Sequence, residues 1–152
     1  AVGQPDRAVV EQPTAVQRHI LVHWHPGHGR LMFYRPSEIS AIRKEAEDAL
    51  RPAFDHSDVA DVETWVQRCI DDQAQLWRRN AYWIISEVQD TKKGRAVHLA
   101  FSAGVYEPAL VDEVNAWAKS IGCVRSFFSG RPGCQRRRPD YRLKYITMEK
   151  EI

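Results

Sequence analysis

Three histidines with the spacing H-x-H-x-x-H, His23, His25 and His28, stand near the start of the chain. On a β-strand every second side chain points to the same face, so His23 and His25 would share a face and His28 would follow on a turn. Imidazoles arranged in this way are candidate ligands for a divalent metal ion. The group contains no carboxylate or cysteine, and aromatic packing with surface hydrogen bonding is the alternative interpretation.

Basic residues are concentrated near the other end of the chain. The net charge of the whole sequence is only +2, but from Cys123 onward there are eight Lys and Arg residues and three Asp and Glu residues. Arg131, Arg136, Arg137 and Arg138 are therefore candidates for contact with an acidic protein face or with nucleic-acid phosphates. Adjacent arginines commonly point in different directions into solvent, and this is the alternative interpretation.

The composition is typical of a soluble globular domain, with 43% apolar and 28% charged residues in a chain of 152. No apolar run approaches the ~20 residues of a membrane-spanning helix, and the first residues lack the pattern of a signal peptide. We therefore expect a protein that stays in the cytoplasm or enters an assembly made there. Cys69, Cys123 and Cys134 form no CxxC pair and are expected to be reduced thiols, with Cys69 and Cys123 in the core.

The elements that must position these residues are best defined between residues 95 and 134. An apolar strand over residues 96–101 ends at Ser-Ala-Gly, and an amphipathic helix begins at Pro108. Gly122 suits a left-handed helix stop, and residues 124–129 are predicted to be the returning strand. The apolar stripe of the helix consists of Leu110, Val114, Trp117 and Ile121. This pattern predicts a βαβ unit with parallel strands and a right-handed crossover.

The rest of the sequence predicts an extended arm over residues 1–17 and a single domain over residues 18–152. The domain is predicted to begin with strands over 18–24 and 31–34, which form a hairpin. Two helices follow: one is capped by Ser37 and ended by Pro52, and the other runs from Ser57 or Asp58 to Asn80 with Val62, Cys69 and Leu76 in its stripe. The remaining elements are an antiparallel hairpin over 81–89 and 95–103, a helical turn over 134–138 and a last strand over 141–150. Together they predict an α+β fold, with helices packed against a mixed β-sheet.

Short segments in roughly the C-terminal half of the chain carry a resemblance to a known family. They are Ile85-Ser86-Glu87-Val88, Val97-His98-Leu99, the run from Trp117 to Cys123, Gly130-Arg131-Pro132-Gly133, Asp140-Tyr141-Arg142 and Glu149-Lys150-Glu151. In these segments the sequence resembles the GNAT-like proteins (N-acetyltransferase fold) that are encoded by tailed bacteriophages. The resemblance implies the GNAT fold, in which two helices precede the main sheet, as in the order of elements predicted above.

The resemblance also indicates where acetyl-CoA would bind. In acetyltransferases of this fold, a Q/R-x-x-G-x-G/A loop after the central strand holds the coenzyme A pyrophosphate with backbone N–H groups. The corresponding residues here are 102–108, where Gly104 is the only glycine, Pro108 lacks an N–H group and Glu107 adds a carboxylate. These changes weaken an anion site. We therefore expect no cofactor, and acetyl-CoA held around Gly104, Val105 and Tyr106 is the alternative.

For acetyl transfer the resemblance implies a base, often a glutamate on a neighbouring strand, and an acid, often a tyrosine after the next strand. Glu87 and Tyr141 stand at matching places in this sequence. Glu87 alternates with apolar neighbours, which favours a solvated carboxylate on the outer face of a sheet. Tyr141 precedes a strand, which favours a role as its anchor, so we expect no catalytic residues, with Glu87 and Tyr141 as the alternative.

Together these implications predict a phage-encoded GNAT-fold protein that has lost catalysis and is a structural or virion-associated component. Its expected partners are other phage structural proteins or copies of itself, reached through the N-terminal arm and the arginines. Its expected location is the host cytoplasm during assembly and then the virion, with the cytoplasm alone as the alternative. Two other functions stay open: an acyl-CoA-dependent N-acetyltransferase with an atypical loop, and a basic nucleic-acid-binding protein.

Overall fold

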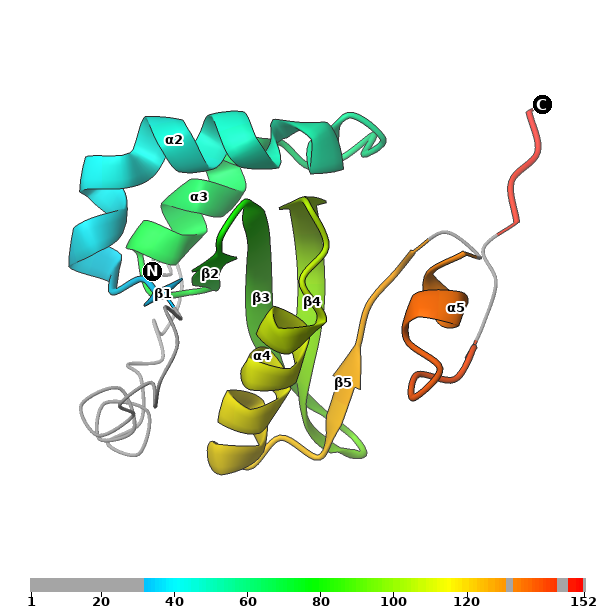
Figure 1. The fold of residues 1–152 in the computed structure, drawn as a ribbon. Coiled ribbons are helices and arrows are strands. Elements are labelled where there is room, and N and C mark those ends of the chain that lie inside the picture. The colour runs from blue at the N-terminus through cyan, green and yellow to red at the C-terminus, as the bar shows by residue number, and fades with distance from the viewer. Residues whose placement is uncertain (1–31, 131–132, 145–147, 152) are drawn as a thin grey trace, which may run out of the picture. The chain divides into compact units, whose positions relative to one another are not determined.

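The computed structural model describes residues 32–130, 133–144 and 148–151, which belong to the compact unit Leu31–Ile152 (Figure 1). Three predictions fall outside the described residues: the extended arm over 1–17, the strand over 18–24 and the group formed by His23, His25 and His28. The hairpin predicted between the strands over 18–24 and 31–34 is therefore not described either.

A five-stranded mixed sheet forms the centre of the described structure, with its strands in chain order (Figure 1). The first four strands are antiparallel to their neighbours, and the last is parallel to the fourth. The strands are β1 (Met32–Phe33), β2 (Gln75–Arg79), β3 (Tyr82–Thr91), β4 (Gly94–Gly104) and β5 (Arg125–Phe127). With the helices that pack on it, this sheet confirms the predicted α+β class.

The helices α2 (Pro36–Phe54), α3 (Val62–Ile70) and α4 (Pro108–Ser120) pack on the two faces of the sheet. The short helix α5 (Cys134–Arg137) follows β5 in the chain. Leu76 of β2 belongs to the core cluster that α2 and α3 form with the sheet, whereas the next residue, Trp77, meets Trp117 of α4 edge to face at 5.2 Å between ring centroids. Because successive strand side chains alternate between faces, α2 and α3 cover one face and α4 covers the other.

The helix α2 starts and ends at residues other than those predicted. Arg35, not Ser37, is the N-cap residue, and its backbone N–H donates to the Glu38 carboxylate at 2.9 Å. Pro52 lies inside the helix, which continues to Phe54. A proline so close to the end of a helix removes only one backbone hydrogen bond. The stacking of Phe54 on Phe101, at 3.8 Å between ring centroids, stabilises the final turn.

The prediction of one helix from Ser57 or Asp58 to Asn80 was wrong. The helix α3 begins after Asp61, whose carboxylate accepts the Thr64 N–H at 2.8 Å, and ends at Ile70. Asp72 then takes a left-handed conformation with a φ of 59°, and Leu76 lies on β2, paired with Ile85 of β3. Leu76 is buried in either arrangement, so its spacing from Cys69 did not distinguish a helix from a strand.

The predicted hairpin and βαβ unit are confirmed. The strands β3 and β4 pair as antiparallel neighbours from Tyr82 to Thr91, and α4 leads into β5, which is parallel to β4. Gly122 has the left-handed φ of 89° expected of a helix stop. The strand β5 is shorter than the predicted 124–129, because it pairs with β4 only through residues 125–127.

The C-terminal segment contains the predicted helical turn, now α5, but the last strand predicted over 141–150 is absent from the described residues 141–144 and 148–150. The alternation of Tyr141 and Leu143 buries little apolar surface here, since Leu143 is 66% exposed. Polar contacts of the Tyr141 hydroxyl hold this segment instead. Among the described helices, none is both long and apolar enough to cross a membrane.

Candidate functional site

The loop between β4 and α4 begins at Gly104, which has a left-handed φ of 98°. A Cβ atom at this position would lie 1.7 Å from the carbonyl oxygen of Ala81. Ala81 belongs to the turn between β2 and β3, and the next residue, Tyr82, pairs directly with Gly104. The glycine is therefore required by the close approach of two backbone segments, and its presence needs no ligand to explain it.

The first turn of α4 offers few donors to an anion. Pro108 has no N–H group, and the Leu110 N–H already donates to the Glu107 carbonyl at 3.0 Å. The Glu107 side chain makes no capping hydrogen bond to the helix, and its carboxylate accepts from the Asn80 amide at 2.9 Å. A phosphate at this helix end would meet a negative charge and a reduced set of backbone donors.

Tyr106 links this loop to the start of β3 and to α5. Its ring meets the Tyr82 ring edge to face at 5.6 Å between centroids, and the Arg137 guanidinium lies 5.6 Å from the centroid of the Tyr106 ring. Burial raises the pKa of Tyr82. The Tyr106 hydroxyl is buried and has no hydrogen-bonding partner among the described residues, while Val105 is 70% exposed.

Glu87 is held in a network on the face of the sheet that α3 covers. Its carboxylate accepts hydrogen bonds from Arg68 at 2.8 Å and from Gln89 at 2.8 Å, and lies 3.1 Å from Nδ1 of His98. Partial burial acts to raise the pKa of Glu87, but the hydrogen bonds from His98, Arg68 and Gln89 outweigh it and hold the pKa below its usual value. A carboxylate held in this way is a weak base.

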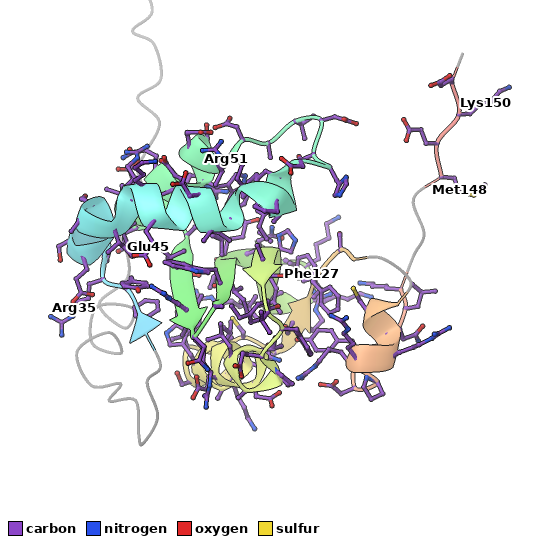
Figure 2. All side chains as sticks on the ribbon, turned by 45° about the horizontal axis from the view of Figure 1, so that its top comes forward. Arg35, Glu45, Arg51, Phe127, Met148 and Lys150 are labelled. Atoms are coloured by element: carbon purple, nitrogen blue, oxygen red, sulfur yellow. The ribbon has the colours of Figure 1, made fainter. Side chains whose placement is uncertain are left out.

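His98 is the residue at this site that the sequence analysis missed. It lies on β4 directly opposite Glu87, and its ring stacks on that of Phe127 of β5 at 4.6 Å between centroids; Phe127 is labelled in Figure 2. An ionised carboxylate only accepts hydrogen bonds, so Nδ1 of His98 donates to Glu87, and Nε2 is the ring nitrogen that remains for another partner. The signal in the sequence was the hairpin register, which places His98 beside Glu87 once the turn is fixed.

Tyr141 connects α4 with β5. Its hydroxyl accepts from the Asn115 amide at 2.8 Å and lies 2.6 Å from the Ser126 hydroxyl, and its ring packs on Phe128. Glu87 instead bonds to groups on α3, β3 and β4. The two residues proposed as base and acid therefore share no hydrogen-bonding partner in the described structure.

The candidate arginines do not lie in one environment. Arg138 is the most enclosed, with a side chain that is 11% exposed and bound to Asp112 at 2.8 Å and to Asp140. These hydrogen bonds raise the pKa of Arg138 further, against the effect of burial. Arg136 and Arg137 are exposed on α5. Arg131 lies outside the described residues.

No group of three or more potential metal ligands occurs in the described residues, and the histidines proposed as ligands lie outside them.

The three cysteines are free thiols, as predicted. Cys69 is fully buried, and burial raises its pKa to about 12, so it is unreactive at neutral pH. Cys123 is only partly buried, so the prediction that it lies in the core holds only in part.

Neither a family model nor a curated protein matches the sequence. The fold, in contrast, is similar to several solved acetyltransferases. An aminoglycoside acetyltransferase from an uncultured soil metagenomic sample has a TM-score of 0.59 and 8% identity, over 81% of this chain and 95% of that chain. A probable acetyltransferase has a TM-score of 0.58 and 10% identity, over 81% of this chain and 99% of that one.

A third structure, the ribosomal-protein-alanine N-acetyltransferase of Brucella melitensis, has a TM-score of 0.55 and 10% identity, over 80% of this chain and 98% of that chain. Identities this low describe the fold and carry no information on activity. The described residues therefore have a GNAT-like fold, as the sequence resemblance implied.

Proposed function

We propose that this chain is a GNAT-fold protein that has lost acetyl transfer and acts through protein–protein contacts. In this proposal it is a structural, virion-associated component of a phage, present in the host cytoplasm during assembly and then in the particle. Its partners are other phage structural proteins or copies of itself. The phage setting is supported by the sequence resemblance, and the loss of catalysis is supported by the geometry of the loop after β4.

The observation that carries the proposal is the start of α4. A pyrophosphate cradle needs several free N–H groups and no competing negative charge. Here Pro108 removes one donor, and the Glu107 carboxylate, held by Asn80, stands at the helix end where the anion would bind. Gly104, the one remaining glycine of the motif, is already required by its contact with Ala81. The loop thus retains the features that connect a strand to a helix and lacks those that hold a phosphate.

The environment of Glu87 supports the same conclusion. A carboxylate can take a proton from an amine only if it releases its existing hydrogen bonds or has a pKa near the working pH. Glu87 is bound by Arg68 and Gln89, and its pKa is held below the usual value. The network instead joins α3 to β3 and β4, which is a structural role.

Calorimetric titration with acetyl-CoA tests this proposal. We expect no binding by the wild-type protein and measurable binding by Glu107→Gly, because the variant removes the carboxylate and frees the helix end. Glu149→Gly removes a charge from an exposed residue outside the loop and is expected to bind no better than wild type. Micromolar binding by the wild-type protein would overturn the proposal.

The second candidate function is an acyl-CoA-dependent N-acetyltransferase, and the His98–Glu87 pair favours it. A carboxylate that orients an imidazole leaves its other nitrogen able to accept a proton from an amine. In this function Nε2 of His98 would be the base, Tyr141 would protonate the thiolate, and the backbone of residues 104–106 would hold the acetyl-CoA phosphates. Acetyl-CoA would supply the acyl group.

Release of free thiol from acetyl-CoA in the presence of a panel of amines tests the second candidate. It predicts activity that His98→Gln lowers by about a hundredfold or more, with Lys92→Ala, at an exposed residue of the turn between β3 and β4, as the control. If the wild-type protein releases no thiol with any amine, the second candidate fails and the first is strengthened.

A further inference from the structure

The described arginines divide into two groups. Those of the first group each form a salt bridge with a carboxylate; they are Arg43, Arg51, Arg68, Arg78, Arg79, Arg95 and Arg138. Figure 2 shows two residues of such pairs, Glu45 and Arg51, on α2. Those of the second group have no carboxylate partner among the described residues; they are Arg35, Arg125, Arg136, Arg137 and Arg142. Three of these five lie within one short segment, residues 136–142.

That segment is held firmly to the body of the domain. Arg138 binds Asp112 of α4 at 2.8 Å and lies over the Tyr141 ring at 5.4 Å from its centroid. The Tyr141 hydroxyl bonds to Asn115 of α4 and to Ser126 of β5. The Tyr141 N–H donates to the Arg138 carbonyl at 3.0 Å, which closes the turn. These contacts anchor the backbone at Arg138 and Tyr141, next to the three arginines that have no carboxylate partner among the described residues.

Two exposed apolar residues are neighbours in the chain of one of these arginines or of a residue that one of them contacts. Arg137 lies over the Tyr106 ring, and the neighbour of Tyr106, Val105, is 70% exposed. Arg142 is followed by Leu143, which is 66% exposed. Exposed apolar residues beside arginines are typical of surfaces that bind proteins, in which arginine and apolar contacts are combined. We call Arg136, Arg137 and Arg142, with Val105 and Leu143, the arginine surface.

We infer that the arginine surface binds an acidic polypeptide segment that carries apolar side chains between its carboxylates. Guanidinium groups bind carboxylates through paired hydrogen bonds, and the three arginines have no such partner among the residues that the structure describes. Because Arg138 and Tyr141 already fix the backbone, binding orders few additional groups. This inference rests on the proposed function in protein–protein contact, and it names the surface and the chemistry of the partner.

The same surface fits a nucleic acid less well. Three arginines neutralise few phosphates, whereas affinity for DNA increases with the number of phosphates neutralised. The exposed Val105 and Leu143 gain nothing from a phosphate partner. A polypeptide uses both the charged and the apolar parts of the surface.

Fluorescence anisotropy with three labelled probes tests the inference on the full chain: a short peptide of alternating glutamate and leucine, an all-glutamate peptide and a short duplex DNA. The double variant Arg136→Glu, Arg137→Glu is compared with Lys92→Glu, Lys93→Glu. The control changes the net charge equally, at exposed residues of the turn between β3 and β4. Circular dichroism confirms that both variants are folded.

We expect the wild-type protein to bind the glutamate–leucine peptide most tightly, and the arginine variant to lose about tenfold or more of that affinity. The lysine variant should keep most of it. Asp112→Asn, which weakens the anchor of Arg138 and leaves the exposed arginines unchanged, should reduce binding by a smaller factor. Equal losses in the two double variants, or tighter binding of the duplex DNA than of either peptide, would overturn the inference.

The outcome is separable from that of the proposed function. Binding of acetyl-CoA by the wild-type protein would overturn the loss of catalysis, and the peptide measurement would still decide whether the arginine surface binds an acidic segment. Failure of all three probes would overturn the arginine surface alone.

Discussion

The two ends of the β3–β4 hairpin differ in how well their polar groups are satisfied. Near its turn, Glu87 is bound by Arg68, Gln89 and His98, and the pKa of the carboxyl group is held low. At the far end, beside Gly104, the Tyr106 hydroxyl is buried without a partner among the described residues, and Val105 is exposed. The first region therefore has the features of a structural network, and the second has those of a partly exposed connection between a strand and a helix.

The proposed function separates the requirements of the fold from those of the site. The sheet and its helices are fixed by burial of apolar side chains such as Trp77 and Leu110, which is insensitive to the chemistry of one loop. A pyrophosphate cradle depends on a few donors and on the absence of negative charge. In the proposed function, Pro108 and Glu107 weaken such a cradle while the GNAT-like fold is kept.

The largest expected effect comes from Gly104→Ala, because the new Cβ would lie 1.7 Å from the Ala81 carbonyl oxygen at a left-handed φ. We expect the free energy of unfolding to fall by about 3 kcal/mol or more. The control is Gly122→Ala, which has a similar φ but open space around its Cβ position, and should cost about 1 kcal/mol. Denaturant unfolding measures both, and equal losses would show that the contact with Ala81 is unimportant.

An intermediate effect is expected for Glu87→Gln, which leaves Arg68 without its carboxylate. We expect a loss of about 1–2 kcal/mol at neutral pH, compared with about 0.5 kcal/mol or less for Glu45→Gln, whose salt bridge with Arg78 is exposed. If the network is important for stability, the loss for Glu87→Gln must be clearly larger than the loss for Glu45→Gln. If the two variants are equally stable, the Glu87 network contributes nothing special to the domain.

The same variant gives a pH signature. The folded-state pKa of Glu87 lies below its ordinary value of 4.5, so ionised Glu87 contributes stability that is fully present above pH 4.5. That contribution is lost as the pH falls below 4.5 and through the folded-state pKa. The difference in unfolding free energy between wild type and Glu87→Gln should therefore shrink on acidification, which urea unfolding over this pH range measures.

The smallest effect is expected at the far end of the hairpin. Tyr106→Phe removes a buried hydroxyl that has no partner among the described residues, so the free energy of unfolding should change by about 0.5 kcal/mol or less. Tyr141→Phe, which removes the bonds to Asn115 and Ser126, should cost about 1 kcal/mol. A large loss for Tyr106→Phe would mean that its hydroxyl has a partner and that the two regions are more alike.

Much of the fold could be predicted because its signals are local. The β3–β4 hairpin and the βαβ unit follow from alternation, from the spacing of apolar residues on α4 and from Gly122. The strand β2 could not be predicted in this way, because Leu76 continues the helical spacing of Cys69 and only pairing with β3 makes it a strand. Pro52 was read as a helix end, although stacking of Phe54 on Phe101 extends α2 beyond it.

The candidate site was less predictable, since it depends on contacts between elements. Glu87 was identified as a candidate base, but its engagement by Arg68 and His98 requires the position of α3 and the hairpin register. The three adjacent arginines look equivalent in sequence, whereas the structure uses Arg138 as an anchor and exposes the other two. That separation depends on Asp112, which lies 26 residues away in the chain.

The central claim is that the loop between β4 and α4 no longer binds acetyl-CoA, and the thermal unfolding of the wild-type protein tests it most directly. A ligand that binds only the folded state increases the free energy of unfolding, by about 2.7 kcal/mol at a hundredfold excess over its dissociation constant. The melting temperature therefore rises with ligand concentration. We predict an unchanged melting temperature at every soluble acetyl-CoA concentration. A rise that increases with acetyl-CoA concentration and saturates would contradict the account.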